Sequence, residues 1–209
     1  MSDSEGAGRP GRSALRFLRE ALLVLGGAVL IAFVLKSLIA QAFFIPSESM
    51  RPQLEVSDRV LVSKLSYRLH DPRRGDIVVF DCPPSRCGQG GDDGSGVSGL
   101  IRSLGRALGL AQPSSQELIK RVVGLPGETV EARGGQVYVD GRRLVEPYLP
   151  PGTATSALAP TRVPEGAVFV LGDNRSFSTD SRVFGPVRRS SVVGRAIGTV
   201  WPPGRAAFL

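Results

Sequence analysis

Two serines, Ser47 and Ser49, stand two residues apart and could supply a nucleophile and a hydroxyl donor to one reaction centre. They lie in the stretch IPSESMRP between Pro46 and Pro52, and these prolines disfavour a helix there. In an extended segment both hydroxyls would face one spot while Glu48 points away. One hydroxyl could then attack a carbonyl while the other stabilises the oxyanion. A polar loop leaving a membrane segment would contain the same residues, and the serines alone leave both interpretations open.

A serine nucleophile also needs a base, for which the sequence offers few candidates. His70 is the one histidine and lies in a polar connection, which disfavours a serine–histidine–aspartate triad and a histidine-rich zinc site. Lysine, unlike arginine, can lose its proton. Strand alternation places Lys120 among aliphatic neighbours, where desolvation would lower its pKa from about 10.4 toward about 7–8. Lys64, in a more polar neighbourhood, is the competing base. A second alternative also stays open, in which Lys120 is a charged ammonium that snorkels to solvent at a strand edge.

The N-terminal part of the chain predicts a membrane segment. The apolar run from Ala21 to Leu35 continues past Lys36, which is enough for a span of about 20 residues. Arginines before the run outnumber acidic residues, so we expect a cytoplasmic tail at 1–20, an anchor at 21–40 and everything after it on the outer face of the membrane. A cleavable secretory signal has the same features and could end at the triplet Ala40-Gln41-Ala42.

The remaining residues, 41–209, predict one mainly β domain outside the cytoplasm. Short valine-rich segments bounded by Gly, Pro or Asp favour antiparallel sheets that form a sandwich or a partly closed barrel. The predicted strands are 59–63, 77–80, 118–125, 129–133, 137–139, 142–145, 168–171 and 192–201. The pair Asp140-Gly141 predicts a hairpin turn, and Gly134-Gly135 offers another. Gly, Ser and Asp clusters predict a surface insertion at about 81–117.

Cysteine content and charge limit the kinds of site and partner that the sequence allows. Cys82 and Cys87 lie close together in the predicted insertion, and outside the cytoplasm such a pair favours a disulfide over a metal site that lacks further ligands. The net charge of +7 is compatible with nucleic acid or with a membrane surface. Export, scattered arginines and the absence of an aromatic platform among them disfavour a nucleic-acid partner.

Four sequence blocks, in order, resemble the motif series of the bacterial type I signal peptidases, the membrane-anchored serine–lysine leader peptidases. The blocks are IPSESMRPQL at 45–54, GDIVVF at 75–80, KRVVGLPGE at 120–128 and GDNRSFSTDSRVFGPV at 172–187. The lysine block distinguishes them from the archaeal and endoplasmic-reticulum relatives, in which a histidine takes that place. Gln53 and Ser176-Phe177 depart from the commonest form of the family, which leaves subsite details open.

The resemblance implies a role for each matching residue. Ser49 resembles the nucleophile and Lys120 the general base, while Ser47 matches the hydroxyl that completes the oxyanion hole. Ser178 matches the serine that orients the lysine amine. Two further residues resemble the supporting pair near the site, Asp180 and Arg182. Neither a cofactor nor a metal is implied.

The resemblance also implies an uncleaved anchor and the removal of signal peptides from exported preproteins, after Ala-x-Ala sites, at the outer face of the cytoplasmic membrane. Ala40-Gln41-Ala42 would then be a self-cleavage site. The expected substrate pockets are lined by Ile45, Pro46, Met50, Leu54 and Ile119. Apolar surface near residues 43–45 is expected to contact membrane lipid. Two alternatives stay open at this point: a catalytically silent, membrane-tethered β binding domain, and a secreted binding protein that has lost residues 1–42.

Overall fold

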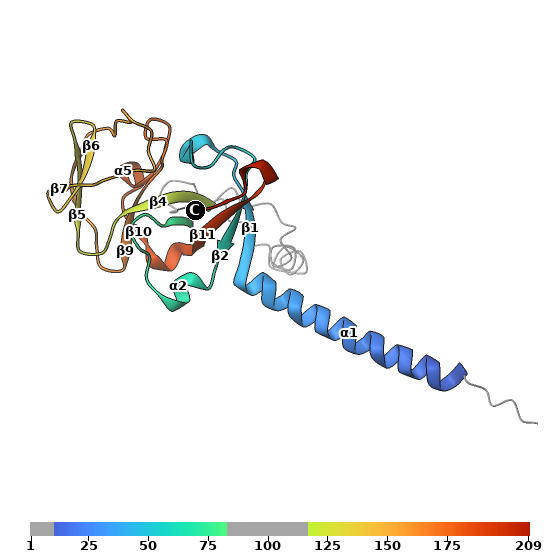
Figure 1. The fold of residues 1–209 in the computed structure, drawn as a ribbon. Helices are drawn as coiled ribbons and strands as arrows, with labels where there is room; N and C mark the ends of the chain where they lie inside the picture. The colour runs from blue at the N-terminus through green and yellow to red at the C-terminus, as the bar shows by residue number, and fades with distance from the viewer. Residues whose placement is uncertain (1–10, 83–116) are drawn as a thin grey trace, which may run out of the picture. The chain divides into compact units, whose positions relative to one another are not determined.

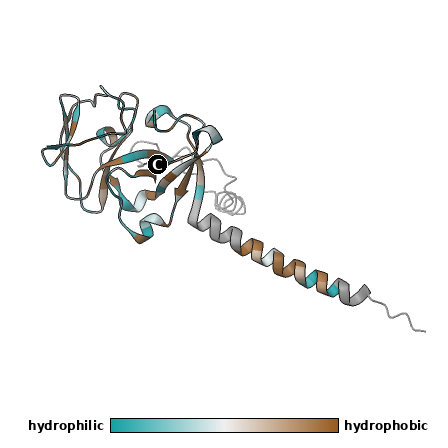
Figure 2. Cartoon of the chain, viewed as in Figure 1, coloured by the Kyte–Doolittle hydropathy of each residue, from teal (hydrophilic) through white to brown (hydrophobic). Residues whose placement is uncertain are grey.

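The computed structural model describes residues 11–82 and 117–209 of the chain, which divides into two compact units, Met1–Ser37 and Leu38–Leu209 (Figure 1). The first unit contains most of the helix α1 (Gly11–Ile39), whose middle part is strongly hydrophobic in Figure 2. Within the described residues, no helix combines the length and the apolar character needed to cross a membrane.

The larger sheet contains the strand that carries Lys120 and Ile119. Its antiparallel order is β1-β2-β11-β3-β4-β9-β10, and β12 pairs with β11. The strands are β1 (Ala40–Phe44), β2 (Arg59–Ser63), β3 (Ile77–Asp81), β4 (Glu117–Gly124), β9 (Ala167–Leu171), β10 (Val187–Arg188), β11 (Val192–Trp201) and β12 (Ala207–Phe208). The central strand β4 lies between β3 and β9, so residues on β4 are covered by neighbours on both edges.

A second antiparallel sheet has the order β7-β6-β5-β8. Its strands are β5 (Thr129–Arg133), β6 (Gln136–Val139), β7 (Arg142–Arg143) and β8 (Leu158–Arg162). Asp140 and Gly141 both have positive φ between β6 and β7, as a type I′ hairpin turn requires, and Gly134 and Gly135 do the same between β5 and β6. Both predicted turns are therefore confirmed.

The prediction of mainly antiparallel β-structure is confirmed, but the predicted closure is not. Among the described strands, β1 and β10 form the free ends of the larger sheet, and neither sheet closes on itself. Two short helices, α2 (Ser66–Leu69) and α5 (Ser181–Phe184), and three single 3₁₀ turns join the strands. The turns are η1 (Glu48–Met50), η2 (Arg189–Ser191) and η3 (Pro203–Arg205).

Valine-rich strand faces form three apolar clusters that fix the relative positions of these elements. One cluster joins β4, β5, β6 and β9, and so packs the second sheet against the larger one, as in Figure 1, where β5 to β7 lie on the side of β9 and β10. A second cluster packs the segment that follows β1 against β2, β3 and β4. This cluster brings the opening serine segment next to the strand of Lys120.

Some predictions fall partly outside the described residues. The predicted insertion at 81–117 is described only at its two ends, and Cys87 lies outside the described residues, so the Cys82–Cys87 bridge stays a prediction. The triplet Ala40-Gln41-Ala42 lies within β1, paired with β2. The expected exposed surface at 43–45 is wrong for two of its residues, because Phe43 and Ile45 are buried within the core and only Phe44 is exposed.

Candidate active site

The segment that carries the two serines changes conformation at Ser49. Ser47 is extended, with φ −129° and ψ 156°, but Glu48–Met50 form the single 3₁₀ turn η1. The predicted extended conformation is therefore wrong for the turn. The two hydroxyls nevertheless converge, since Ser47 Oγ lies 3.2 Å from Ser49 Oγ. Ser47 is exposed, whereas Ser49 is buried.

The loop that follows β9 forms two hydrogen bonds to the 3₁₀ turn η1. The backbone N–H of Asn174 donates to the Ser49 carbonyl at 3.0 Å, and its side-chain Nδ2 donates to the Glu48 carbonyl at 3.1 Å. One isolated 3₁₀ turn satisfies few of its own carbonyl groups, so these two bonds help to fix the direction of the Ser49 side chain. Sequence reasoning missed this role of Asn174, because nothing in local spacing connects residues 126 positions apart.

Lys120 lies beside Ser49 at the centre of the larger sheet. Its Nζ is 2.7 Å from Ser49 Oγ and donates to the Ile119 carbonyl at 2.8 Å. The residue is 2% exposed. The structure thus brings together the serine and the lysine that the sequence analysis named, although they stand 71 positions apart.

Burial has a direct electrostatic consequence for Lys120. Desolvation lowers its pKa from 10.5 to about 8, against the opposing effect of the nearby carboxylates of Asp180 and Asp173. A substantial fraction of the amine is therefore neutral near pH 8. The two other candidate bases lie elsewhere: Lys64 follows β2 and is partly exposed, and His70 contacts the Asp71 carbonyl at 2.9 Å and the edge of Tyr67.

Ser178 lies close to the nucleophile segment but does not bond to it. A Cβ atom on Gly172 would collide with both the Ser178 hydroxyl and the Ser49 carbonyl oxygen, so only glycine allows these two segments to approach. The Ser178 Oγ is buried and has no hydrogen-bond partner within the part of the chain that the structure describes. A buried hydroxyl without a partner is unusual in a folded protein and calls for an explanation.

The expected supporting pair, Asp180 and Arg182, forms a compact ion pair below this loop. Arg182 Nε and Nη2 each donate to the Asp180 carboxylate at 2.8 Å. Asp180 is completely buried, begins α5 and also accepts the Gly172 N–H at 3.0 Å. Its charge is therefore compensated, and its contacts fix the glycine that separates Ser178 from Ser49.

A second set of charged residues connects the lysine strand to the second sheet. Arg121, next to Lys120, forms a two-pronged ion pair with Asp173 at 2.8 and 2.6 Å, and its guanidinium lies 4.0 Å from the Tyr148 ring centre. Tyr148 donates to Glu146 at 2.7 Å, and Glu146 in turn accepts from the buried Arg175 at 2.5 Å. The backbone N–H of Arg175 donates to the Asp173 carbonyl at 3.0 Å, which closes these contacts into a ring. The sequence analysis did not identify Glu146 or Tyr148.

The five residues expected to line substrate pockets fall into two groups. Ile45, Met50, Leu54 and Ile119 belong to one apolar cluster and are all buried, with exposed fractions of 7% or less. Pro46 is exposed at the surface. The apolar cluster therefore adjoins both Ser49 and Lys120, through their immediate chain neighbours.

A sequence model described as signal peptidase, peptidase S26, matches residues 18–201, which include every residue of this site. The chain belongs to this family. Signal peptidase I of Leptolyngbya laminosa is 41% identical over 195 residues, which cover 92% of this chain and 84% of the relative. The probable signal peptidase I-1 of Synechocystis is 40% identical, over 92% of this chain and 87% of the relative.

A third relative is similar over almost the whole chain. Signal peptidase I of Mycobacterium tuberculosis is 36% identical over 241 aligned positions, which cover 98% of this chain and 81% of the relative. The family expected from the four sequence blocks is therefore confirmed. The similarity extends over most of the chain.

Proposed function

We propose that this protein is a membrane-anchored serine endopeptidase that removes signal peptides from exported preproteins, with Ser49 as nucleophile and Lys120 as general base. The observation that carries the proposal is the 2.7 Å separation between Ser49 Oγ and a lysine amine with a lowered pKa. Membership in the signal peptidase family supports the substrate class. A serine is a weak nucleophile until a neighbouring base removes its proton.

The position of the amine suits proton transfer in both directions. One N–H of Lys120 is directed to the Ile119 carbonyl, which leaves the lone pair of the neutral amine available to the Ser49 hydroxyl. As Ser49 Oγ attacks the scissile carbonyl, its proton moves to Lys120, and the resulting ammonium then protonates the leaving amine. Lys120 next removes a proton from a water molecule, which hydrolyses the acyl-enzyme. The remaining N–H of Lys120 would have Ser178 as its acceptor, which accounts for the orphaned hydroxyl.

The charge that develops on the carbonyl oxygen also needs stabilisation. We assign this role to the Ser49 N–H and the Ser47 hydroxyl, which lies 3.2 Å from Ser49 Oγ at the exposed edge of the site. Loss of one such donor costs catalysis about 10²–10³-fold in other hydrolases. The Asn174 bonds to the turn would keep this N–H correctly oriented.

Substrate would bind as an extended segment between the serine turn and β4, with its small side chains against the apolar cluster. Met50 and Leu54 are completely buried and would form the floor, while Ile45 and Ile119 form the walls and Pro46 the rim. A shallow apolar site of this kind accepts alanine and rejects larger side chains, in keeping with cleavage after Ala-x-Ala.

Membrane attachment through α1 is part of the same proposal. The helix has nine large apolar side chains that are each 60–74% exposed, between Phe17 and Ile31. A contiguous apolar surface of this extent requires a cover of lipid or protein. The arginines before the run favour a cytoplasmic N-terminus, which places the catalytic unit on the outer face of the cytoplasmic membrane.

The proposal is tested with the purified full-length chain in detergent and a preprotein whose signal sequence ends in Ala-x-Ala. We expect one cut, directly after the second alanine, and no cut by Ser49→Ala, with both products identified by mass spectrometry. An intact preprotein after incubation with correctly folded enzyme would support a silent binding domain instead. A purified chain that begins after Ala42 would favour a secreted protein.

A further inference from the structure

A pocket of about 240 Å³ opens beside the active-site loop. Its walls come from the segment between β7 and β8, from the loop after β9 and from α5, and they include Ser156, Arg175, Ser176, Ser178 and Arg182. Pockets that hold whole small molecules measure about 300–1,000 Å³. This smaller pocket, with polar side chains beside Ala154 and Val183, is suited to one or two side chains of a larger ligand.

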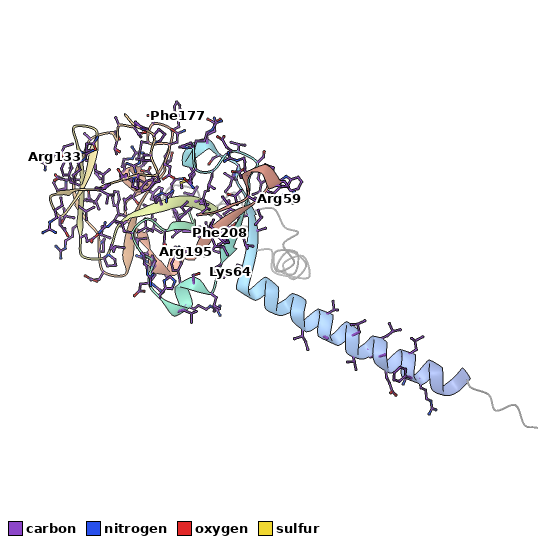
Figure 3. All side chains as sticks on the ribbon, viewed as in Figure 1. Arg59, Lys64, Arg133, Phe177, Arg195 and Phe208 are labelled. Carbon is purple, nitrogen blue, oxygen red and sulfur yellow. The ribbon has the colours of Figure 1, made fainter. Side chains whose placement is uncertain are left out.

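Ser178 links the pocket to the reaction centre. It lines the pocket, its buried Oγ lacks a partner among the described residues, and Gly172 alone separates it from the Ser49 carbonyl. The residue before it in the loop, Phe177, is 77% exposed and projects from the surface in Figure 3. A peptide that leaves the centre on the Ser178 side would therefore cross this loop and reach the pocket.

The chemistry of the proposed reaction decides which half of the substrate lies there. The ammonium of Lys120 must give its proton to the leaving amine, so the residues after the cut must lie on the lysine side of the scissile bond. The loop that lines the pocket is attached to the strand of this lysine, since Asp173, at its first end, pairs at 2.6 Å with Arg121, the residue after Lys120. The residues before the cut lie instead against the apolar cluster of Ile45 and Ile119.

We infer that this pocket binds the first residues of the mature chain, directly after the cut, and favours side chains that carry a hydroxyl or a carboxylate. The inference rests on the proposed function. Arg182 Nη1 donates to the Ser156 hydroxyl at 3.0 Å at the exposed rim. A carboxylate accepts such a bond more strongly than a neutral hydroxyl does. The carboxylates of Asp180 and Glu146 are already engaged by Arg182 and Arg175, respectively.

Two opposite substitutions at Ser156 test this inference. The substrates are synthetic peptides with one common Ala-x-Ala sequence before the cut and either Glu or Lys at the first, second or third position after it. The full-length wild type should cleave the Glu peptide faster at one of these positions. Ser156→Asp should lower the Glu-to-Lys ratio of kcat/KM and Ser156→Lys should raise it, each by roughly threefold to fivefold, as for a partly exposed charge pair.

Opposite shifts from one position cannot result from a general loss of folding, which would lower both rates together. Ser190→Asp, an exposed serine in η2, is the matched control and should leave the ratio unchanged. The same pair of substitutions at Ser176 repeats the test on the opposite rim. Cleavage with a Glu-to-Lys ratio that is the same in all variants, or that shifts in one direction only, would overturn the inference alone. A wild type that cleaves none of the peptides would overturn the proposed function and the pocket assignment with it.

Discussion

Replacement of Lys120 by methionine should stabilise the folded protein at pH 6 although it abolishes cleavage. Burial lowers the pKa of this lysine from 10.5 to about 8. At about 1.4 kcal/mol per pH unit, the difference of about 2.5 units means that the charged amine destabilises the native state by about 3 kcal/mol below pH 8. Methionine is similar in length and carries no charge.

The substitution also removes a hydrogen bond, which offsets part of this gain. The Ile119 carbonyl loses its lysine partner, at a cost of about 1 kcal/mol, while Ser49 Oγ keeps Ser47 as a neighbour. The expected net gain at pH 6 is therefore about 2 kcal/mol in the free energy of unfolding.

The pH dependence has a definite sign. Between pH 8 and about 10.5 the unfolded wild type holds one more proton at this position than the folded protein does, so wild-type stability rises with pH through that window. The variant lacks this group, and its advantage should disappear before pH 10.5.

The assay is urea unfolding of the full-length chain in detergent, followed by circular dichroism at pH 6, 8 and 10. A variant that is less stable than the wild type at pH 6, or a difference that is the same at all three pH values, would refute the assignment of a desolvated lysine.

Three other outcomes follow from the same geometry. The kcat/KM for preprotein cleavage should rise with pH through an apparent pKa near 8, as the Lys120 amine becomes neutral, and His70→Ala should leave this profile in place. Ser178→Ala should lower kcat about tenfold, as expected for one orienting hydrogen bond, and an unaltered kcat would remove Ser178 from the site. Glu146→Ala should lower the free energy of unfolding by about 3 kcal/mol because it leaves Arg175 buried without its carboxylate, whereas Tyr148→Phe should lower it by about 1 kcal/mol. Thermal denaturation measures both losses, and equal losses would contradict the ring of contacts.

The elements that sequence patterns predicted well are those in which local chemistry decides the conformation. The strands at 59–63, 129–133 and 192–201 have the predicted bounds, and both Gly-containing hairpin turns form as expected. The alternation around Lys120 correctly indicated a buried position, because a central strand leaves little access to water on either face.

The features that sequence patterns did not predict all depend on contacts between residues far apart in the chain. No strand is predicted before residue 59, yet residues 40–44 pair with β2 as strand β1. The serine turn is set by Asn174 from a distant loop, and the ring through Glu146 depends on the second sheet packing beside the first. Local periodicity contains no information about such partners, and only the four family blocks connected Ser178 to Lys120 before the fold was known.

The most direct test of the central claim compares the rates at which Lys120→Ala and Lys64→Ala cleave the same preprotein, at equal concentration and with intact folding verified by circular dichroism. Both variants lose one lysine charge, but only Lys120 lies 2.7 Å from Ser49 Oγ. The serine–lysine account predicts no detectable cleavage by Lys120→Ala and a wild-type rate for Lys64→Ala. Substantial cleavage by Lys120→Ala, together with a loss in Lys64→Ala, would contradict it.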